Sequence, residues 1–132
     1  MAVIQRNDYG AIAVNKGVIE KILVTDLLNM KSGIFLSNKK GKLIKGEKTH
    51  FVSPDCYDAV EVYQKKYENI IKVYIIVKFG KSMSDIASEI MDKFDDDFRN
   101  LGLDVPSKIT VYVKGMMAKH VVPKNIEFIR KN

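Results

Sequence analysis

Residues 70–115, IIKVYIIVKFGKSMSDIASEIMDKFDDDFRNLGLDVPSKITVYVKG, decide the fold. Apolar and polar side chains alternate over 71–79, which is typical of a strand with one buried face. A helix is predicted next. The capping sequence 82–85 marks its start, apolar residues recur at helical spacing, and Gly102 stands where a left-handed C-terminal cap belongs. Alternation returns over 109–113, and two strands joined through a helix should lie parallel in one sheet.

Shorter elements flank this unit. Residues 10–14 and 34–36 have the pattern of brief strands, and the helix between them is predicted to begin after Asn15. Residues 59–66 form a further strand, which a turn joins to the central strand as a hairpin. The order β-α-β-β-β-α-β predicts an α+β fold class, a single two-layer domain whose mixed β-sheet carries two amphipathic helices on one face.

Length and composition are those of a soluble globular protein, with 132 residues, 46% hydrophobic and 29% charged. We expect a single domain over residues 1–118 and a basic C-terminal tail over residues 119–132. The lone cysteine, Cys56, excludes an intramolecular disulfide. Neither a secretory leader nor an apolar run long enough to span a bilayer is seen. The sequence therefore predicts a cytoplasmic protein that contacts a membrane only through its surface or a partner.

The formal net charge of +6 raises the question of a nucleic-acid partner. Nearly all of the positive charge is lysine, since only Arg6, Arg99 and Arg130 are arginines. Recognition of phosphates and base edges favours the flat arginine fork. Abundant Lys, Asn, Ile and Tyr also follow from an AT-rich coding sequence. Charge alone therefore leaves a polyanion partner and a compositional origin both open.

No catalytic or metal-binding pattern assembles in the sequence. Residues 41–49 are one insertion away from a phosphate-binding P-loop, but the inserted Glu47 opposes a phosphate and no strand–loop–helix context is predicted. His50, Cys56 and His120 do not give the four-ligand spacing of a zinc site, and no positioned base for a cysteine nucleophile is predicted. We therefore expect no enzyme, no catalytic residue, no metal, no cofactor and no small-molecule substrate.

Acidic residues gather on the helix of the central unit. Asp92 and Asp96 share a helix face, and Asp95 is spaced to pair with Arg99. Hard cations need six or more oxygens from converging directions, and one convex helix surface does not supply them. A solvated acidic face is therefore expected, which includes Asp97.

The outer side of the sheet is the most distinctive predicted surface. If Val73, Ile75 and Val77 face the helices, tyrosines and lysines of three strands point away from them. Such a face is consistent with a plain solvated surface, a protein interface or a base-stacking platform. The candidate residues are Tyr63, Lys65, Lys72, Tyr74, Lys78, Tyr112 and Lys114.

A long irregular connection, residues 37–58, carries a cluster of lysines: Lys39, Lys40, Lys42, Lys45 and Lys48. Long connections inside small domains are uncommon and are often functional. We expect this positive loop of one copy to meet the acidic helix of another at Asp92, Asp95 and Asp96, which predicts self-association.

Several of these segments resemble the alkaline shock protein family. Residues 10–15, Gly-Ala-Ile-Ala-Val-Asn, resemble its opening strand and helix cap, and Gly33-Ile34 resembles its glycine–valine pair. The strand 73–80, the helix 82–98 and the closing Val-Tyr-Val-Lys-Gly of 111–115 resemble its C-terminal half. The lysine-rich connection is longer than is usual in the family, and Leu23 replaces a small residue.

The resemblance implies a small bacterial protein that is associated with cell-envelope or alkaline stress and has no known catalytic activity. It further implies a homo-oligomer that can be held near the membrane by a separate anchor protein. It transfers no catalytic residue to this chain. A nucleic-acid-binding module that uses the Tyr/Lys sheet face is the alternative hypothesis.

Overall fold

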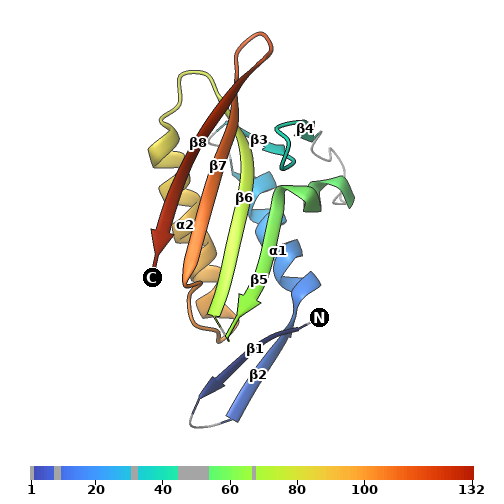
Figure 1. Cartoon of the computed structure of the whole chain (residues 1–132), viewed down its shortest axis with the longest axis vertical. Helices are drawn as coiled ribbons and strands as arrows, with labels where there is room; N and C mark the ends of the chain where they lie inside the picture. The colour runs from blue at the N-terminus through green and yellow to red at the C-terminus, as the bar shows by residue number, and fades with distance from the viewer. Residues whose placement is uncertain (1, 8–9, 31–32, 45–53, 67) are drawn as a thin grey trace.

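The computed structural model describes residues 2–7, 10–30, 33–44, 54–66 and 68–132 (Figure 1). Its elements, in chain order, are β1 (Ala2–Asn7), β2 (Gly10–Asn15), α1 (Lys16–Asn29), β3 (Ile34–Ser37), β4 (Leu43–Ile44), the 3-10 helix η1 (Pro54–Ala59), β5 (Val60–Lys65), β6 (Glu68–Lys78), α2 (Met83–Asn100), β7 (Lys108–Met117) and β8 (Val121–Lys131).

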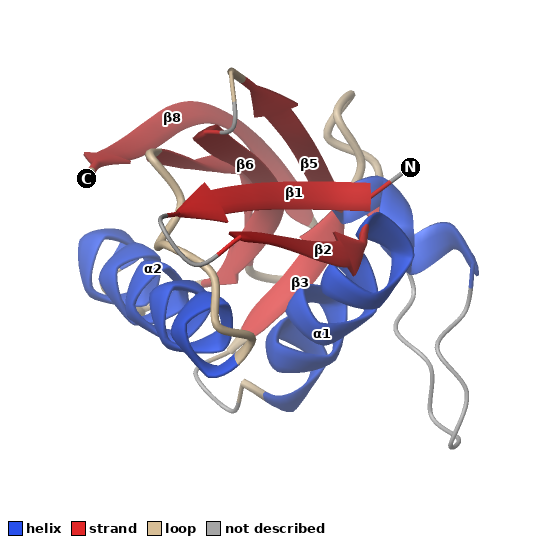
Figure 2. Ribbon diagram, turned by 90° about the horizontal axis from the view of Figure 1, so that it is seen from below, coloured by secondary structure: helices blue, strands red, loops and turns tan. Residues whose placement is uncertain are grey.

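Strand β6 is the centre of a six-stranded mixed sheet. One side of β6 pairs in parallel with β7, and β8 follows β7 at the edge. Strands β5 and β3 pair antiparallel with successive parts of the other side, and β4 lies beyond β3. Both α1 and α2 lie on one face of this sheet (Figure 2). The α+β class, the two layers and the parallel pair around α2 are therefore confirmed.

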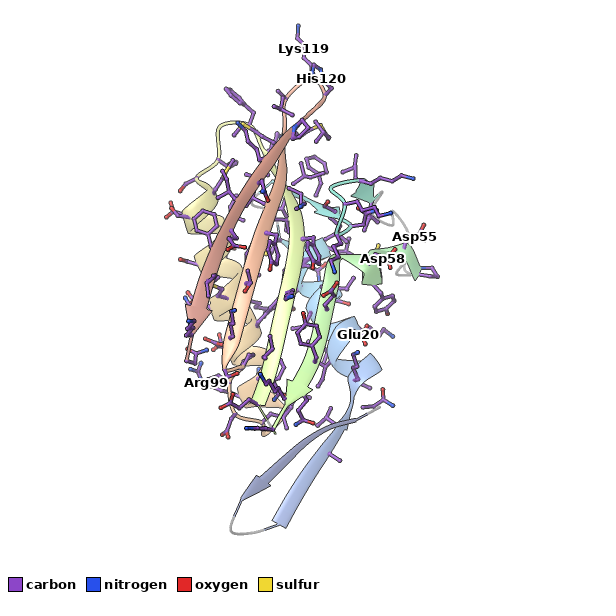
Figure 3. The ribbon with its side chains drawn as sticks, in the orientation of Figure 1. Glu20, Asp55, Asp58, Arg99, Lys119 and His120 are labelled. Carbon is purple, nitrogen blue, oxygen red and sulfur yellow. The ribbon has the colours of Figure 1, made fainter. Side chains whose placement is uncertain are left out.

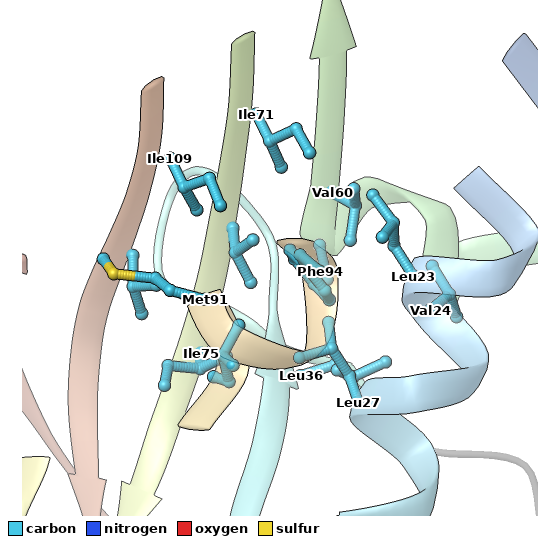
Figure 4. Packing of buried hydrophobic residues seen from close by; sticks show 14 of the residues in the cluster. Leu23, Val24, Leu27, Leu36, Val60, Ile71, Ile75, Met91, Phe94 and Ile109 are labelled. Atoms are coloured by element: carbon cyan, nitrogen blue, oxygen red, sulfur yellow. The ribbon is translucent and has the colours of Figure 1, made fainter. Parts of the chain in front are cut away.

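The inner face of β6 forms the middle of the core. Ile71, Val73, Ile75 and Val77 are completely buried in one apolar cluster with side chains of both helices. Figure 4 shows Ile75 of β6, Phe94 of α2 and Leu27 of α1 in this cluster. The predicted strand register is therefore confirmed, because one step of slippage would exchange the two faces of β6.

Local capping fixes the ends of α2. The Ser82 hydroxyl accepts a hydrogen bond of 3.3 Å from the backbone N–H of Asp85. At the other end, Gly102 has φ +77°, and the N–H of Leu103 donates to the carbonyl of Phe98 at 2.9 Å. This is the Schellman pattern, which satisfies carbonyls that the helix end leaves without partners. Both predicted caps are confirmed.

Two segments differ from the expected arrangement. The strand expected over 10–14 does not join the main sheet, because β2 pairs along its length with β1 in a separate hairpin (Figure 1). Alternation predicted a strand here but carried no information about its partner. Most of the segment expected to be a basic tail is strand β8, antiparallel to β7. Because β8 is an edge strand with mostly exposed side chains, its sequence lacks a clear apolar alternation.

Replacing Ile75 by Ala should lower the free energy of unfolding by about 2–5 kcal/mol, because it leaves a cavity under α2. Urea denaturation measures the change. Ile126→Ala, on the exposed edge strand, is the matched control and should change stability by no more than about 0.5 kcal/mol. An Ile75→Ala variant as stable as the parent would contradict the register described above.

Candidate interaction surface

The side of the main sheet that faces away from both helices, named here the outer sheet face, is turned toward the viewer in Figure 3. Tyr63, Tyr74 and Tyr112 lie on it, because each directly follows a valine that is buried on the helix side of its strand. Tyr74 of β6 pairs with Tyr112 of β7, and their rings stack with centroids 5.1 Å apart and an interplanar angle of 14°. Tyr63 lies on β5, on the other side of β6. Tyr74 is only 3% exposed, so a fully solvated ring is wrong at this position. Its ring instead packs within the outer sheet face, under the exposed side chains around it.

Charged groups hold the Tyr63 ring in place. The Lys72 Nζ lies 5.4 Å from the ring centroid, and the Tyr63 hydroxyl donates a hydrogen bond of 3.4 Å to the Glu61 carboxylate. Hydrogen bonding with Tyr63 raises the pKa of Lys72, so its ammonium stays charged. Burial, with the Glu61 carboxylate nearby, raises the pKa of Tyr74, so its hydroxyl stays protonated. The middle of the outer sheet face is therefore preorganised.

The first part of the lysine-rich connection borders this face. The Asn38 side chain accepts hydrogen bonds of 2.9 Å from the backbone N–H groups of Lys40 and Lys42, which closes a tight β3–β4 turn. A side chain built at Gly41 would lie 3.7 Å from the Cβ of Lys114, so the turn lies against that lysine. Lys39, Lys40 and Lys42 are exposed on it, whereas Lys45 and Lys48 lie outside the described residues.

The remaining predicted lysines do not join this cluster. Lys65 ends β5 and borders a shallow groove with Lys108 and Lys131. Lys78 ends β6 at the opposite end of the sheet, beside Gly33. Lysines therefore stand at both ends of the outer sheet face as well as beside the β3–β4 turn, with Glu61 and Glu127 among them.

Phe35 belongs to this surface and was missed by the sequence analysis. The β3–β6 register places it directly beside Ile76, and its side chain is 38% exposed. Ile34 and Leu36 on either side of it turn toward the core. The alternation of residues 34–36 was the available signal, because it predicts that Phe35 points away from its two neighbours.

The acidic helix face differs from the expectation of a solvated surface. Asp95 and Asp97 are buried. Arg130 of β8 reaches over α2 and bonds Asp92 at 2.8 Å and Asp95 at 3.1 Å. The hydrogen bond with Asp92, followed by that with Asp95, raises the pKa of Arg130. The expectation of a solvated acidic face was wrong because strand β8, which carries Arg130, was not predicted from the sequence.

Pairing on this helix also differs from the prediction. Arg99 bonds Asp96 at 3.1 Å, in place of the predicted Asp95, whose carboxylate also accepts a hydrogen bond of 3.3 Å from the Asn132 amide. Asp92 and Asp96 keep exposed side chains, but Asp95 is committed to contacts within the chain.

An acid pair between the two helices is a second feature that the sequence analysis missed. Asp26 of α1 and Asp97 of α2 lie close enough for a proton on one carboxyl to form a hydrogen bond with the other, and Lys93 stands beside them. Burial, followed by the hydrogen bond and the charge of Asp97, raises the pKa of Asp26 to about 8, against the smaller lowering effect of Lys93. One buried oxygen of each carboxyl, Oδ2, has no hydrogen-bond donor among the described residues. A proton on Asp26 supplies that donor and ties α1 to α2.

The cleft beside this pair is acidic. Its lining includes Asp26, Glu89, Asp92, Lys93 and Asp96. Across the described ranges, no group of three or more His, Cys, Asp or Glu side chains is arranged to hold a metal ion. The pair acts as a helix–helix contact in this structure.

Stability should fall as the pH rises above the ordinary Asp26 pKa of 3.8, and it should level off above about 8. The folded-state pKa of Asp26 is raised above its ordinary value of 3.8, so its stabilising contribution is lost as the pH approaches and passes about 8. Deprotonation leaves two buried carboxylates without a donor, which should cost about 1–3 kcal/mol. Urea unfolding at several pH values measures this. Asp26→Asn should flatten the dependence of the unfolding free energy on pH. Asp85→Asn, at an exposed position, is the control and should leave that dependence unchanged. Equal pH slopes in wild type and Asp26→Asn would contradict the acid pair.

These features define a class, a two-layer α+β domain in which both main helices cover one sheet face and the other face carries aromatic and basic side chains.

The family model of the alkaline shock protein 23 family, described by a cell envelope-related function, matches residues 4–118. The chain belongs to this family, which confirms the resemblance. No curated protein and no solved structure matches it. None of the helices in the described part is long and apolar enough to cross a membrane.

Proposed function

We propose that this chain is a non-catalytic, self-associating cytoplasmic protein of the cell-envelope stress response. It acts through protein–protein contacts made by the outer sheet face, and a separate anchor protein holds it near the membrane. Family membership supports the cell-envelope role. The outer sheet face, which carries an exposed aromatic side chain within a basic surround, is the observation that supports contact through a surface.

The chemistry of this face suits a protein partner. Interfaces are enriched in aromatic residues and combine an apolar centre with a polar rim. Phe35, whose side chain is 38% exposed, supplies an apolar group, while Lys72, Lys114 and the β3–β4 turn supply charge. The stacked Tyr74 and Tyr112 rings need no reordering when a partner docks, which reduces the entropy cost of binding.

A nucleic-acid-binding module receives less support. Base stacking needs a ring face that is open to an incoming base. Tyr74 presents one ring face to Tyr112 and is almost completely buried, and the Tyr63 ring is already under the Lys72 ammonium. The lysines would bind a polyanion only through charge, so that binding should be weak and should disappear at high salt.

Sedimentation velocity over a range of protein concentrations tests the proposal. Phe35→Ser and Lys72→Glu should each weaken self-association by roughly fivefold to tenfold, as expected for side chains near the centre of an interface. Phe79→Ser is the matched control, because Phe79 is 69% exposed but lies in the turn after β6. A wild-type chain that stays monomeric, or a Phe79→Ser variant as disruptive as Phe35→Ser, would overturn the assignment of this face.

A further inference from the structure

The free edge of β8 carries an unused set of backbone hydrogen-bonding groups. Strand β8 ends the sheet order, and no described segment pairs with its far side. It is long for an edge strand, with eleven residues, and most of its side chains are exposed. An unpaired edge of this kind is a template for another strand.

The hydrogen bonds to β7 decide which groups point outward. The N–H of Asn132 donates to the carbonyl of Ser107 at 2.9 Å, so Asn132 points toward β7. Successive residues of a strand point to opposite sides in the plane of the sheet. Lys131, Ile129 and Glu127 therefore direct their N–H and C=O groups away from β7, toward the free edge.

The side chains of these three residues share one face of the sheet. Glu127 pairs with Tyr112 and Ile129 pairs with Thr110, which places both on the outer sheet face with Lys131. Ile129 is 49% exposed. Along the edge, the negative side chain of Glu127 is thus followed by the exposed apolar side chain of Ile129 and the positive side chain of Lys131.

This order is complementary to itself under a two-fold rotation. If two β8 strands meet antiparallel with Ile129 opposite Ile129, Glu127 of each copy faces Lys131 of the other, and the outward backbone groups match. A centre at Glu127 would instead bring two carboxylates together, and a centre at Phe128 would leave Glu127 opposite Ile129. Charge complementarity therefore selects one register.

We propose that the free edge of β8 is a dimerisation site whose occupant is the β8 strand of a second copy, antiparallel about a two-fold axis at Ile129. This inference rests on the self-association proposed above and adds an interface and a register to it. The two main sheets become one continuous sheet, and the two outer sheet faces lie on the same side of it. Each dimer then presents both faces to further contacts.

Cysteine cross-linking in the full chain tests the register. Ile129→Cys places two thiols opposite each other at the axis, whereas Ile126→Cys, the matched control on the same strand, lies opposite Asn132 of the second copy. The native Cys56 is buried. Mild oxidation should give about fivefold or more disulfide-linked dimer with Ile129→Cys, because only there do the two Cα atoms come within disulfide range. Equal yields from the two variants, or no dimer with Ile129→Cys, would overturn the register.

Charge reversal tests the same pairing without a new covalent bond. Glu127→Lys and Lys131→Glu should each weaken dimerisation by about tenfold, because two ion pairs become two repulsive pairs. The double variant should restore wild-type affinity, measured by sedimentation equilibrium. Failure of the double variant to restore it would overturn the proposal.

The outcomes separate this inference from the proposed function. If Phe35→Ser disrupts assembly and the charge reversals do not, edge pairing is overturned and association through the outer sheet face stands. If the wild-type chain is monomeric at every concentration, both fail. If the charge reversals act on the first association step and Phe35→Ser acts only on larger assemblies, both are supported.

Discussion

Burial of the inner face of β6 is the constraint on which the rest of this structure depends. Four completely buried β-branched residues, Ile71, Val73, Ile75 and Val77, meet side chains from both helices. Both helices must therefore lie on the same side of the sheet, and the crossover from β6 through α2 to β7 places the second parallel strand beside the first. The two layers follow from this single packing requirement.

The same requirement leaves the other sheet face without a helix to cover it. A bare face in a chain of this size must be stabilised by its own side chains, and the Tyr74–Tyr112 stack and the Lys72–Tyr63 contact do this. The fold thus produces an ordered surface that is fixed before any partner arrives. On this surface Phe35 is 38% exposed, and no described segment pairs with the far edge of β8, which is why we propose these two places as the contacts with a second chain.

Local patterns predicted what depends on neighbours in sequence. The Ser82 and Gly102 caps, the inward register of Ile75 and the outward direction of Tyr74 all follow from spacing of a few residues. Features that depend on distant segments were missed. Arg130 reaches Asp95 across 35 positions, and Asp26 meets Asp97 only because two helices pack together. Neither contact has a signature in local periodicity, and an exposed edge strand such as β8 has almost none.

Lysine labelling on the assembled full chain tests most directly whether association uses the outer sheet face. A small amine-reactive reagent would be applied at concentrations where the protein is monomeric and where it is associated, with peptide mass spectrometry as the readout. The account predicts reduced labelling of Lys72 and Lys114 on association, with unchanged labelling of Lys21 and Lys93, which are exposed on the helical layer. Protection of Lys21 and Lys93, with Lys72 and Lys114 unchanged, would contradict it.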